Sequence, residues 1–319
     1  MKFQLKILFI LLISLLVWEN DSQAFWVWTP KTNQAVNPKF AVKDTPDEQF
    51  DWAMRFFKKY EFSRAADEFI RLVESYPDSD LAPEAQYYAG RSYEEIGKYL
   101  YAFENYQKTL EKYPYTKRME EILEREYNIA NIFQNKETSK LMEMELSLSL
   151  ERAGDIYEKV VENSPFGEYA DKSLFEAAGC YRRMLNYKKA IETYERIVND
   201  YPESKLGIEA KYQLAYTRYE SSLGPEYDQE STDEAIKEFK DISNNTAVPS
   251  IAKEATTVYD ELTAKKADSE VKIAEFYEKK GKYQSALFYY EGVVSNFAGT
   301  PAAEIAQGKV EQLNEKVKK

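Results

Sequence analysis

The sequence of 319 residues contains no histidine and only one cysteine, Cys180. Without histidine, the chain cannot form Ser-His or Cys-His nucleophile pairs, imidazole general bases or histidine metal sites. A single cysteine cannot form a disulfide within the chain. Cys180 stands beside Tyr181 in a predicted helix and is interpreted as a small buried residue. We therefore expect a protein that is not an enzyme and that holds no cofactor or metal ion.

Positive charge, glycine and proline are also scarce. The chain has 43 Lys and Arg against 55 Asp and Glu, a formal net charge of -12, and 11 residues each of glycine and proline. A nucleic-acid-binding protein needs a basic face to neutralise phosphates, so this class is excluded. Few helix breakers, together with 26 tyrosines, favour packed helices. The acidic runs Glu120-Glu121 and Glu124 to Glu126 lack the alternating ligands of a Ca2+ loop and are interpreted as a solvated helix face.

The N-terminal segment 1–24 has the features of an export signal. Lys2 and Lys6 precede an apolar run from Ile7 to Trp18, which is short for a bilayer span but suits a signal-peptide core. Ser22-Gln23-Ala24 then places small residues where a signal peptidase cleaves, so we expect cleavage after Ala24. An uncleaved N-terminal anchor is the alternative. No cysteine follows the apolar run to serve as a lipid-anchor site.

A repeated pattern indicates a series of helices. Six alanines head similar stretches, namely Ala65, Ala102, Ala153, Ala190, Ala235 and Ala286. Four residues after each alanine stands an aromatic, in order Phe69, Tyr106, Tyr157, Tyr194, Phe239 and Tyr290. This spacing lies on one face of a helix. The first four stretches each end, twelve residues after the alanine, at a proline that separates one helix pair from the next: Pro77, Pro114, Pro165 and Pro202.

A preceding helix is predicted in each unit from a small residue with an aromatic three positions later. The small residues are Ala53, Gly90, Ala130, Ala178, Ala215 and Ala274, and only the fifth unit, with Arg218, lacks the aromatic. Small residues let two helices approach closely, and the ring fills the adjacent groove. The third and fifth units are longer, so we expect loops inside them, the second from Ser221 to Thr232. Residues from about Pro249 to Lys280 are expected to form one long helix.

These residues resemble the tetratricopeptide repeat over about residues 47–301. The resemblance implies an all-α solenoid of about six helical hairpins with a right-handed superhelical twist, closed by a polar capping helix at 302–319. Gly97-Lys98-Tyr99 and Gly281-Lys282-Tyr283 are interpreted as turns between helices, because no second glycine or following Ser/Thr makes them phosphate loops. The Trp-rich segment 25–46 has no helical period and is expected to pack on the first repeat or to touch a membrane or a partner.

A narrower resemblance comes from the repeats together with the export signal. The stretches "AADEFIRLVESYPDS", "AGDIYEKVVENSPFGEYAD", "AIETYERIVNDYPESKLGIEAKYQLA" and "AEFYEKKGKYQSALFYYEGVVSNFAGT" resemble the BamD-like family. That family implies a periplasmic scaffold at the inner face of the outer membrane. Its partners would be unfolded outer-membrane β-barrel proteins at the N-terminal repeats and subunits of the β-barrel assembly machinery at the C-terminal ones. Another periplasmic scaffold, resembling the Tol-Pal coordinator or serving pilus or polysaccharide export, is the alternative.

Tetratricopeptide geometry predicts where such partners bind. Three positions before the small residue, five aromatics are expected to face the concave groove: Phe50, Tyr87, Tyr127, Phe175 and Tyr212. Such a ladder could hold an extended chain that carries aromatic side chains. Polar candidates to meet a C-terminal carboxylate are Arg91, Asn131, Arg182 and Arg183. The competing interpretation is that these rings belong to the core between helices.

Overall fold

The computed structural model describes residues 27–29, 34–36, 41–135, 143–222, 229–245 and 247–317. The chain divides into two compact units, Met1–Thr116 and Lys117–Lys319, and each is considered by itself. The export signal, the cleavage site at Ala24 and most of the predicted loop after Ser221 lie outside the described residues. Among the described residues, no helix has both the length and the apolar character needed to cross a membrane.

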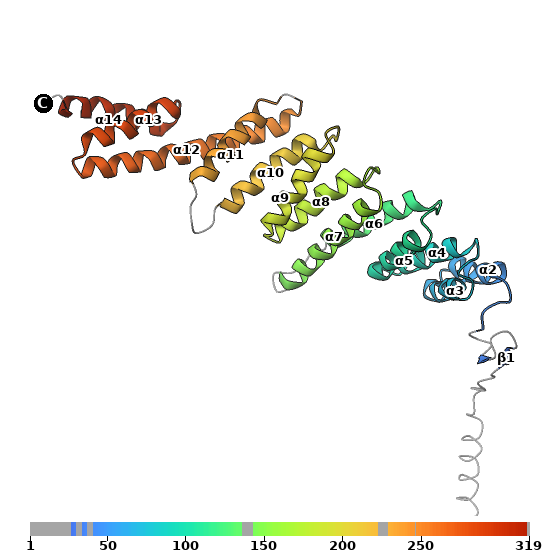
Figure 1. Ribbon diagram of the computed structural model, residues 1–319. Helices are drawn as coiled ribbons and strands as arrows, with labels where there is room; N and C mark the ends of the chain where they lie inside the picture. Colours follow the sequence, from blue (N-terminus) through green and yellow to red (C-terminus); the bar gives the residue numbers. More distant parts are fainter. Residues whose placement is uncertain are drawn as a thin grey trace, which may run out of the picture. The chain divides into compact units, whose positions relative to one another are not determined.

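The first unit begins with a short antiparallel strand pair and continues with two helical hairpins (Figure 1). Strand β1 (Val27–Thr29), in the Trp-rich segment, pairs with β2 (Gln34–Val36). The helices are α2 (Pro46–Lys58), α3 (Phe62–Ser75), α4 (Ala82–Glu95) and α5 (Tyr99–Lys112). Helix α2 starts as its sequence predicts, with Pro46 in the first turn and the Thr45 hydroxyl accepting from the Glu48 backbone N–H.

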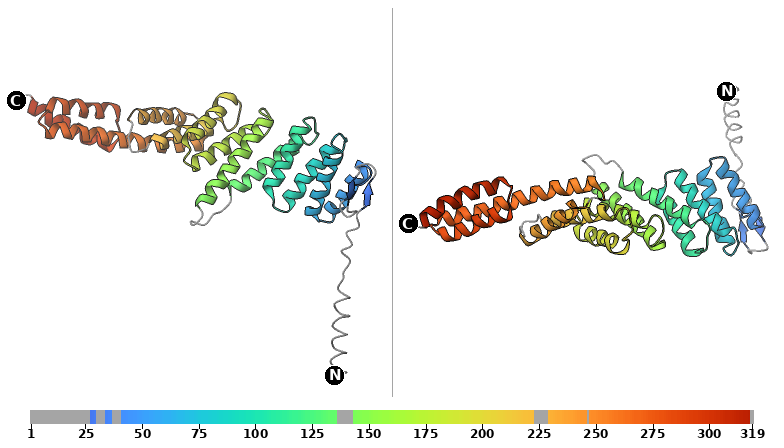
Figure 2. Two further views of the ribbon diagram at one scale, coloured as in Figure 1. Left: turned by 60° about the horizontal axis from the view of Figure 1, so that its bottom comes forward. Right: turned by 90° about the horizontal axis from the view of Figure 1, so that it is seen from above.

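The second unit contains four hairpins and a closing helix. The helices are α6 (Met119–Gln134), α7 (Glu143–Asn163), α8 (Ala170–Arg183), α9 (Tyr187–Asp200), α10 (Gly207–Ser222), α11 (Gln229–Ser243), α12 (Pro249–Lys279), α13 (Tyr283–Asn296) and α14 (Pro301–Val317). Within this unit each helix packs on the next one in sequence, and α14 lies beside both α12 and α13 (Figure 2). The described residues thus confirm the all-α class and the repeated hairpins, and they confirm the single long helix α12.

The predicted small residues and rings meet inside each hairpin. The six alanines of the second helices are at most 2 % exposed. The approach is close in the second hairpin, where a Cβ added to Gly90 would lie 2.6 Å from Cε1 of Tyr106. Because interiors are packed at near-crystal density, the small residue sets how near the two helices of a hairpin can come.

The second-helix ring is a tyrosine wherever its hairpin partner is polar. Four positions after the small residue, the first helices carry Phe57, Glu94, Gln134, Arg182, Tyr219 and Glu278, in order. The tyrosine hydroxyls of Tyr106 and Tyr290 donate to Glu94 and Glu278, respectively. Phe69, by contrast, packs against Phe57, with ring centroids 6.5 Å apart. A buried hydroxyl needs a partner, so the polar side chain accounts for the choice of tyrosine over phenylalanine.

Tyrosines before the closing prolines tie successive hairpins together. The Tyr113 hydroxyl donates to the Pro77 carbonyl oxygen at 3.3 Å, and the Tyr201 hydroxyl donates to the Pro165 carbonyl oxygen at 2.6 Å. Both bonds span 36 residues, one hairpin to the next. In these two Tyr-Pro pairs the proline therefore ends its helix, and the phenol holds the turn that closes the preceding hairpin.

Arg218 stands three residues after Ala215, where the first helices of the other hairpins carry an aromatic residue. One guanidinium nitrogen lies 2.7 Å from Glu195 of α9, and another pairs with Glu238 of α11. The arginine therefore links the second helices of two successive hairpins, which a ring at this position could not do.

Three sequence interpretations need correction. Helix α7 begins at Glu143, ten residues before Ala153, so much of the extra length in the third hairpin is helix and not loop. Helix α11 begins at Gln229, before the predicted loop end at Thr232. Glu126 is fully buried, so the acidic stretch of α6 is not wholly a solvated face. In the first two cases the helix is longer than the local composition indicated, and in the third one acidic side chain of the helix faces the core.

An ion pair fastens the closing helix α14 to α12 and makes stability depend on pH. Lys309 Nζ lies 3.1 Å from Glu278 Oε2. Burial alone would raise the pKa of Glu278, but hydrogen bonds from Lys309 and Tyr290, together with the charge of Lys309, hold it below its usual value. A carboxyl whose pKa is lowered by folding stabilises the fold above its unfolded pKa and loses that contribution as pH falls through the folded pKa.

We therefore expect Lys309→Met to lower the thermal midpoint at pH 7. The gap between variant and parent should narrow as the pH falls below the usual glutamate range, and it should close once the pH has passed the lowered pKa of Glu278 in the folded parent. Thermal unfolding followed by circular dichroism across this pH range checks the prediction. Lys272→Met, at an exposed lysine of α12, is the control. A gap that stays constant with pH would contradict the ion-pair origin.

Candidate functional site

The five predicted groove rings all pack inside their own hairpins. Each ring lies against the second-helix aromatic of the same hairpin. Centroid distances are 5.5 Å for Phe50–Phe69, 6.0 Å for Tyr87–Tyr106, 5.5 Å for Tyr127–Tyr157, 5.7 Å for Phe175–Tyr194 and 5.8 Å for Tyr212–Phe239. The shared register that suggested a ladder is thus accounted for by one repeated contact of the hairpin core.

Exposure separates these five rings. Tyr87 is only 1 % exposed, so in this structure it is a core residue and offers no surface to a peptide. Phe50, Tyr127, Phe175 and Tyr212 are half-buried, so each presents part of its ring outside the core. The rings belong to two units, Phe50 and Tyr87 to the first and the other three to the second.

Two of the polar candidates serve the hairpins that carry them. Arg91 donates to the Tyr87 hydroxyl at 3.1 Å and pairs with Glu95, also at 3.1 Å. The Asn131 Oδ1 accepts from the Tyr157 hydroxyl at 2.7 Å. Both side chains therefore support buried tyrosines.

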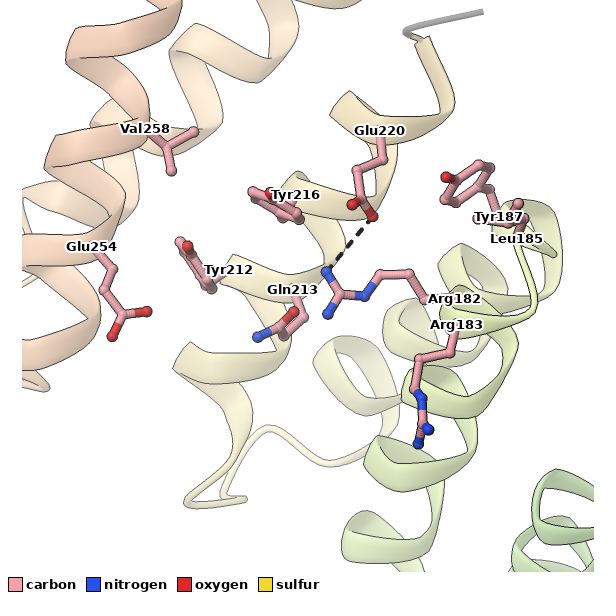
Figure 3. Close-up of a pocket in the computed structure, with 10 residues that line it drawn as sticks. All are labelled: Arg182, Arg183, Leu185, Tyr187, Tyr212, Gln213, Tyr216, Glu220, Glu254 and Val258. Atoms are coloured by element: carbon pink, nitrogen blue, oxygen red, sulfur yellow. Dashed lines mark ion pairs between the residues drawn. The ribbon is translucent and has the colours of Figure 1, made fainter. Parts of the chain in front are cut away.

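Tyr212, Arg182 and Arg183 do come together, in a groove of the second unit (Figure 3). The groove has a volume of about 670 Å3 and is formed by α8, α10, α12 and the turn that follows α8. Its lining comprises Arg182, Arg183, Leu185, Tyr187, Tyr212, Gln213, Tyr216, Glu220, Glu254 and Val258. We call it the α8–α10–α12 groove.

Stacked rings form the middle of the groove. Tyr212 and Tyr216, one turn apart on α10, are stacked with centroids 6.2 Å apart. The guanidinium of Arg182 lies 5.4 Å from the centre of the Tyr216 ring. Burial and the nearby carboxylate of Glu254 raise the pKa of Tyr212, so this phenol is neutral at pH 7. The middle of the groove is therefore aromatic.

The charged residues of the groove stand on three helices. Arg182 pairs with Glu220 at 3.6 Å, and Arg183 donates to the Gln134 carbonyl oxygen at 3.1 Å. Figure 3 shows Arg182 reaching from α8 to Glu220 on α10, Arg183 pointing in another direction from the same helix, and Glu254 farther off on α12. The site can thus accept a carboxylate beside the arginines and an apolar or aromatic segment over the tyrosines.

Sequence reasoning identified three residues of this lining, Arg182, Arg183 and Tyr212, and missed the other seven. Glu254 and Val258 stand four residues apart on α12, which puts them on one helical face, but the sequence interpretation treated this helix only as a long element. Tyr216 follows the small residue Ala215 and stands one helical turn after the predicted groove ring, Tyr212. An aromatic at Tyr212 with a second at Tyr216 was the signal that could have indicated a stacked surface.

The remaining candidates carry no chemistry. Burial raises the pKa of Cys180 to about 12, although Arg183 opposes this, so the thiol is protonated and inert near neutral pH. Within the described ranges, no cluster of three acidic or cysteine side chains is arranged to hold a metal ion. Gly97 and Gly281 both lie in turns between helices, with φ of +71° and +72°.

Comparison with known proteins associates the second unit with a family. The model of the family YfiO, described as "Outer membrane lipoprotein", matches residues 143–318, which is more than half of the chain. A tetratricopeptide-repeat model matches residues 84–114. The α8–α10–α12 groove lies wholly inside the YfiO match.

Individual relatives are distant. The outer membrane protein assembly factor BamD of Caulobacter vibrioides is 22 % identical over 148 residues, which is 46 % of this chain and 48 % of that protein. The chain thus spans about half the length of this curated relative. A tetratricopeptide-repeat protein from Parabacteroides merdae is 14 % identical, with a TM-score of 0.35, over 84 % of this chain and 98 % of that one. The C-terminal part of a repeat protein from Cytophaga hutchinsonii is 13 % identical, with a TM-score of 0.36, over 82 % and 88 %.

Proposed function

The chain belongs to the YfiO family of outer membrane lipoproteins, and from that premise we propose that it is a periplasmic scaffold of outer-membrane protein assembly. In this role it binds unfolded β-barrel chains and partner subunits and catalyses no reaction. The distant similarity to an outer membrane protein assembly factor supports the proposal.

The observation that carries the proposal is the α8–α10–α12 groove. It combines a stacked aromatic floor, Tyr212 with Tyr216, and two guanidiniums from α8. An unfolded barrel chain offers what this surface fits: extended backbone, alternating apolar side chains and a terminal carboxylate. When an aromatic ring of the peptide covers Tyr212 or Tyr216, apolar surface is removed from water. This stabilises the complex by ~25 cal/mol per Å2 of buried apolar surface. The resemblance alone implied substrate binding at the N-terminal repeats, whereas we propose the later hairpins, because the groove lies there.

A second surface suits a folded partner subunit. Four rings of the last hairpin contact one another in series: Phe276 with Tyr277 at 5.7 Å, Tyr277 with Tyr289 at 5.4 Å, and Tyr289 with Phe288 at 5.6 Å. Phe276 is 56 % and Phe288 is 73 % exposed. Contiguous exposed aromatics are typical of protein interfaces, so this end of the repeats is where we place the machinery subunits.

Peptide binding tests the substrate role. A labelled peptide with the alternating sequence of a final barrel strand, ending in phenylalanine with a free carboxylate, should bind the purified chain. Fluorescence anisotropy should show about tenfold weaker binding for Arg182→Gln, because a charge-assisted hydrogen bond is lost. The same peptide with an amidated C-terminus should bind the parent chain about as weakly as the free peptide binds the variant.

Arg196→Gln is the matched control, since Arg196 also pairs with a glutamate, Glu158 at 3.2 Å, but lies on α9 outside the groove. It should bind the peptide like the parent chain. Equal loss in both variants, or indifference to amidation, would contradict the proposed site. Co-purification from envelope extracts then tests the partners: recovery of the barrel insertase supports the assembly role, and recovery of Tol-Pal, pilus or polysaccharide-export proteins alone overturns it.

A further inference from the structure

Four turns between the helices of a hairpin share one backbone geometry. In each, the second residue after the first helix has a positive φ and donates its N–H three residues back, and the next residue donates five residues back. The four residues are Tyr60, Gly97, Leu185 and Gly281, with φ of 62°, 71°, 60° and 72°. Glycine adopts this conformation freely, whereas a side chain at this position is strained.

Two of the four turns therefore carry a bulky residue where glycine would fit without strain. Tyr60 recovers part of the loss through its ring, which lies 5.8 Å from the ring of Phe62 in an edge arrangement. Leu185 is 70 % exposed, so burial of its side chain in the fold offsets little of the strain. A strained, exposed apolar residue that the fold itself does not need is a sign of a role in binding.

Leu185 is also the one of these residues that lines the α8–α10–α12 groove. Figure 3 shows it beside Tyr187 at the turn after α8, on the arginine side and across from Val258. The same turn carries Arg182 and Arg183 at the end of the preceding helix. An apolar side chain and two guanidiniums thus stand within four consecutive residues, Arg182 to Leu185.

We propose that Leu185 is a specificity-determining residue of the groove, which contacts a large apolar side chain of an extended peptide whose carboxylate lies beside Arg182 and Arg183. The inference rests on the proposed peptide-binding function. The positive φ holds the leucine at the rim, where a residue in an ordinary helical conformation would point elsewhere, and burial against the peptide offsets the strain in the complex. The two arginines bind the terminal carboxylate of the peptide, and Leu185 discriminates among the side chains next to it.

Substitution should separate strain from contact. Leu185→Gly relieves the strained conformation and removes the contact, so it should raise the thermal midpoint by about 2–4 °C while weakening peptide binding about tenfold. Leu185→Met keeps both the strain and an apolar side chain, and should match the parent chain in both measurements. The probe is the barrel-strand peptide described above, synthesised with leucine or alanine at one position at a time.

A double-mutant cycle identifies the contact itself. For one peptide position near the carboxylate, leucine should bind better than alanine with the parent chain, and this preference should vanish with Leu185→Gly. If the parent chain binds the peptides and Leu185→Gly binds them equally well, the inference fails while the proposed function stands. If the parent chain binds no such peptide, both fail. A midpoint lowered by Leu185→Gly would show that the leucine stabilises the fold, and would also overturn the inference.

Discussion

Tyr157→Ala is expected to lower the free energy of unfolding by about 3–5 kcal/mol, the usual effect of truncating a fully buried aromatic ring. Tyr157 is 0 % exposed in α7, and its ring lies 5.5 Å from that of Tyr127 in α6. Its hydroxyl lies 2.7 Å from Asn131 Oδ1 and 2.5 Å from Gln134 Oε1, so it can donate to either amide. The substitution therefore leaves a cavity between α6 and α7 and removes the link between them. Urea denaturation, with the midpoint and slope fitted together, measures the loss.

Tyr157→Phe is the matched control, because it keeps the ring and removes only the hydroxyl. It should cost about 1–2 kcal/mol, the range for a buried hydrogen bond whose acceptors can turn to other partners. The Gln134 side chain keeps one hydrogen bond, donated by its amide nitrogen to Glu176 at 2.6 Å, while its oxygen loses the tyrosine donor. Equal losses for the alanine and phenylalanine variants would contradict the packing account, since the ring would then contribute nothing.

Much of the fold follows from spacing alone. The alanine-to-aromatic offset located the second helices, and the prolines located their ends, because each pattern reflects a local constraint of helix geometry or backbone donors. The helix lengths in the third and fifth hairpins did not follow. Residues before Ala153 and Ala235 continue the helices towards the N-terminus, and nothing in their spacing distinguishes this from a loop.

The candidate site was predictable only in part. Tyr212 and Arg182 were identified from their register, but the same register included Tyr87, which is core. The position of a residue in the repeat determines the direction in which its side chain points from the helix. Whether that side chain is buried depends on the packing of the neighbouring hairpin, which the position does not give. Leu185 was missed although the repeat offered a signal: it stands five residues before Ala190, at the position that Gly97 and Gly281 occupy in their own hairpins.

Gly90→Ala is expected to destabilise the protein by about 1–3 kcal/mol, although alanine is the better helix former. The new Cβ would lie 2.6 Å from Cε1 and 2.7 Å from Cδ1 of Tyr106, and 3.3 Å from the Ala102 carbonyl oxygen. Tyr106 is fully buried and its hydroxyl is held by Glu94, so the ring has little freedom to move away. Overpacking therefore outweighs the gain in helix propensity.

Gly179→Ala, also in the first helix of a hairpin, is expected to change the free energy of unfolding in the opposite direction. Its added Cβ would meet only the Tyr194 hydroxyl, at 3.9 Å, an ordinary contact. Removing glycine from the interior of α8 should therefore stabilise the protein by about 0.5–1 kcal/mol. Urea denaturation of both variants tests the pair. Stabilisation by Gly90→Ala would mean that α4 and α5 can separate without loss, and that the small residue does not set the distance between the two helices of its hairpin.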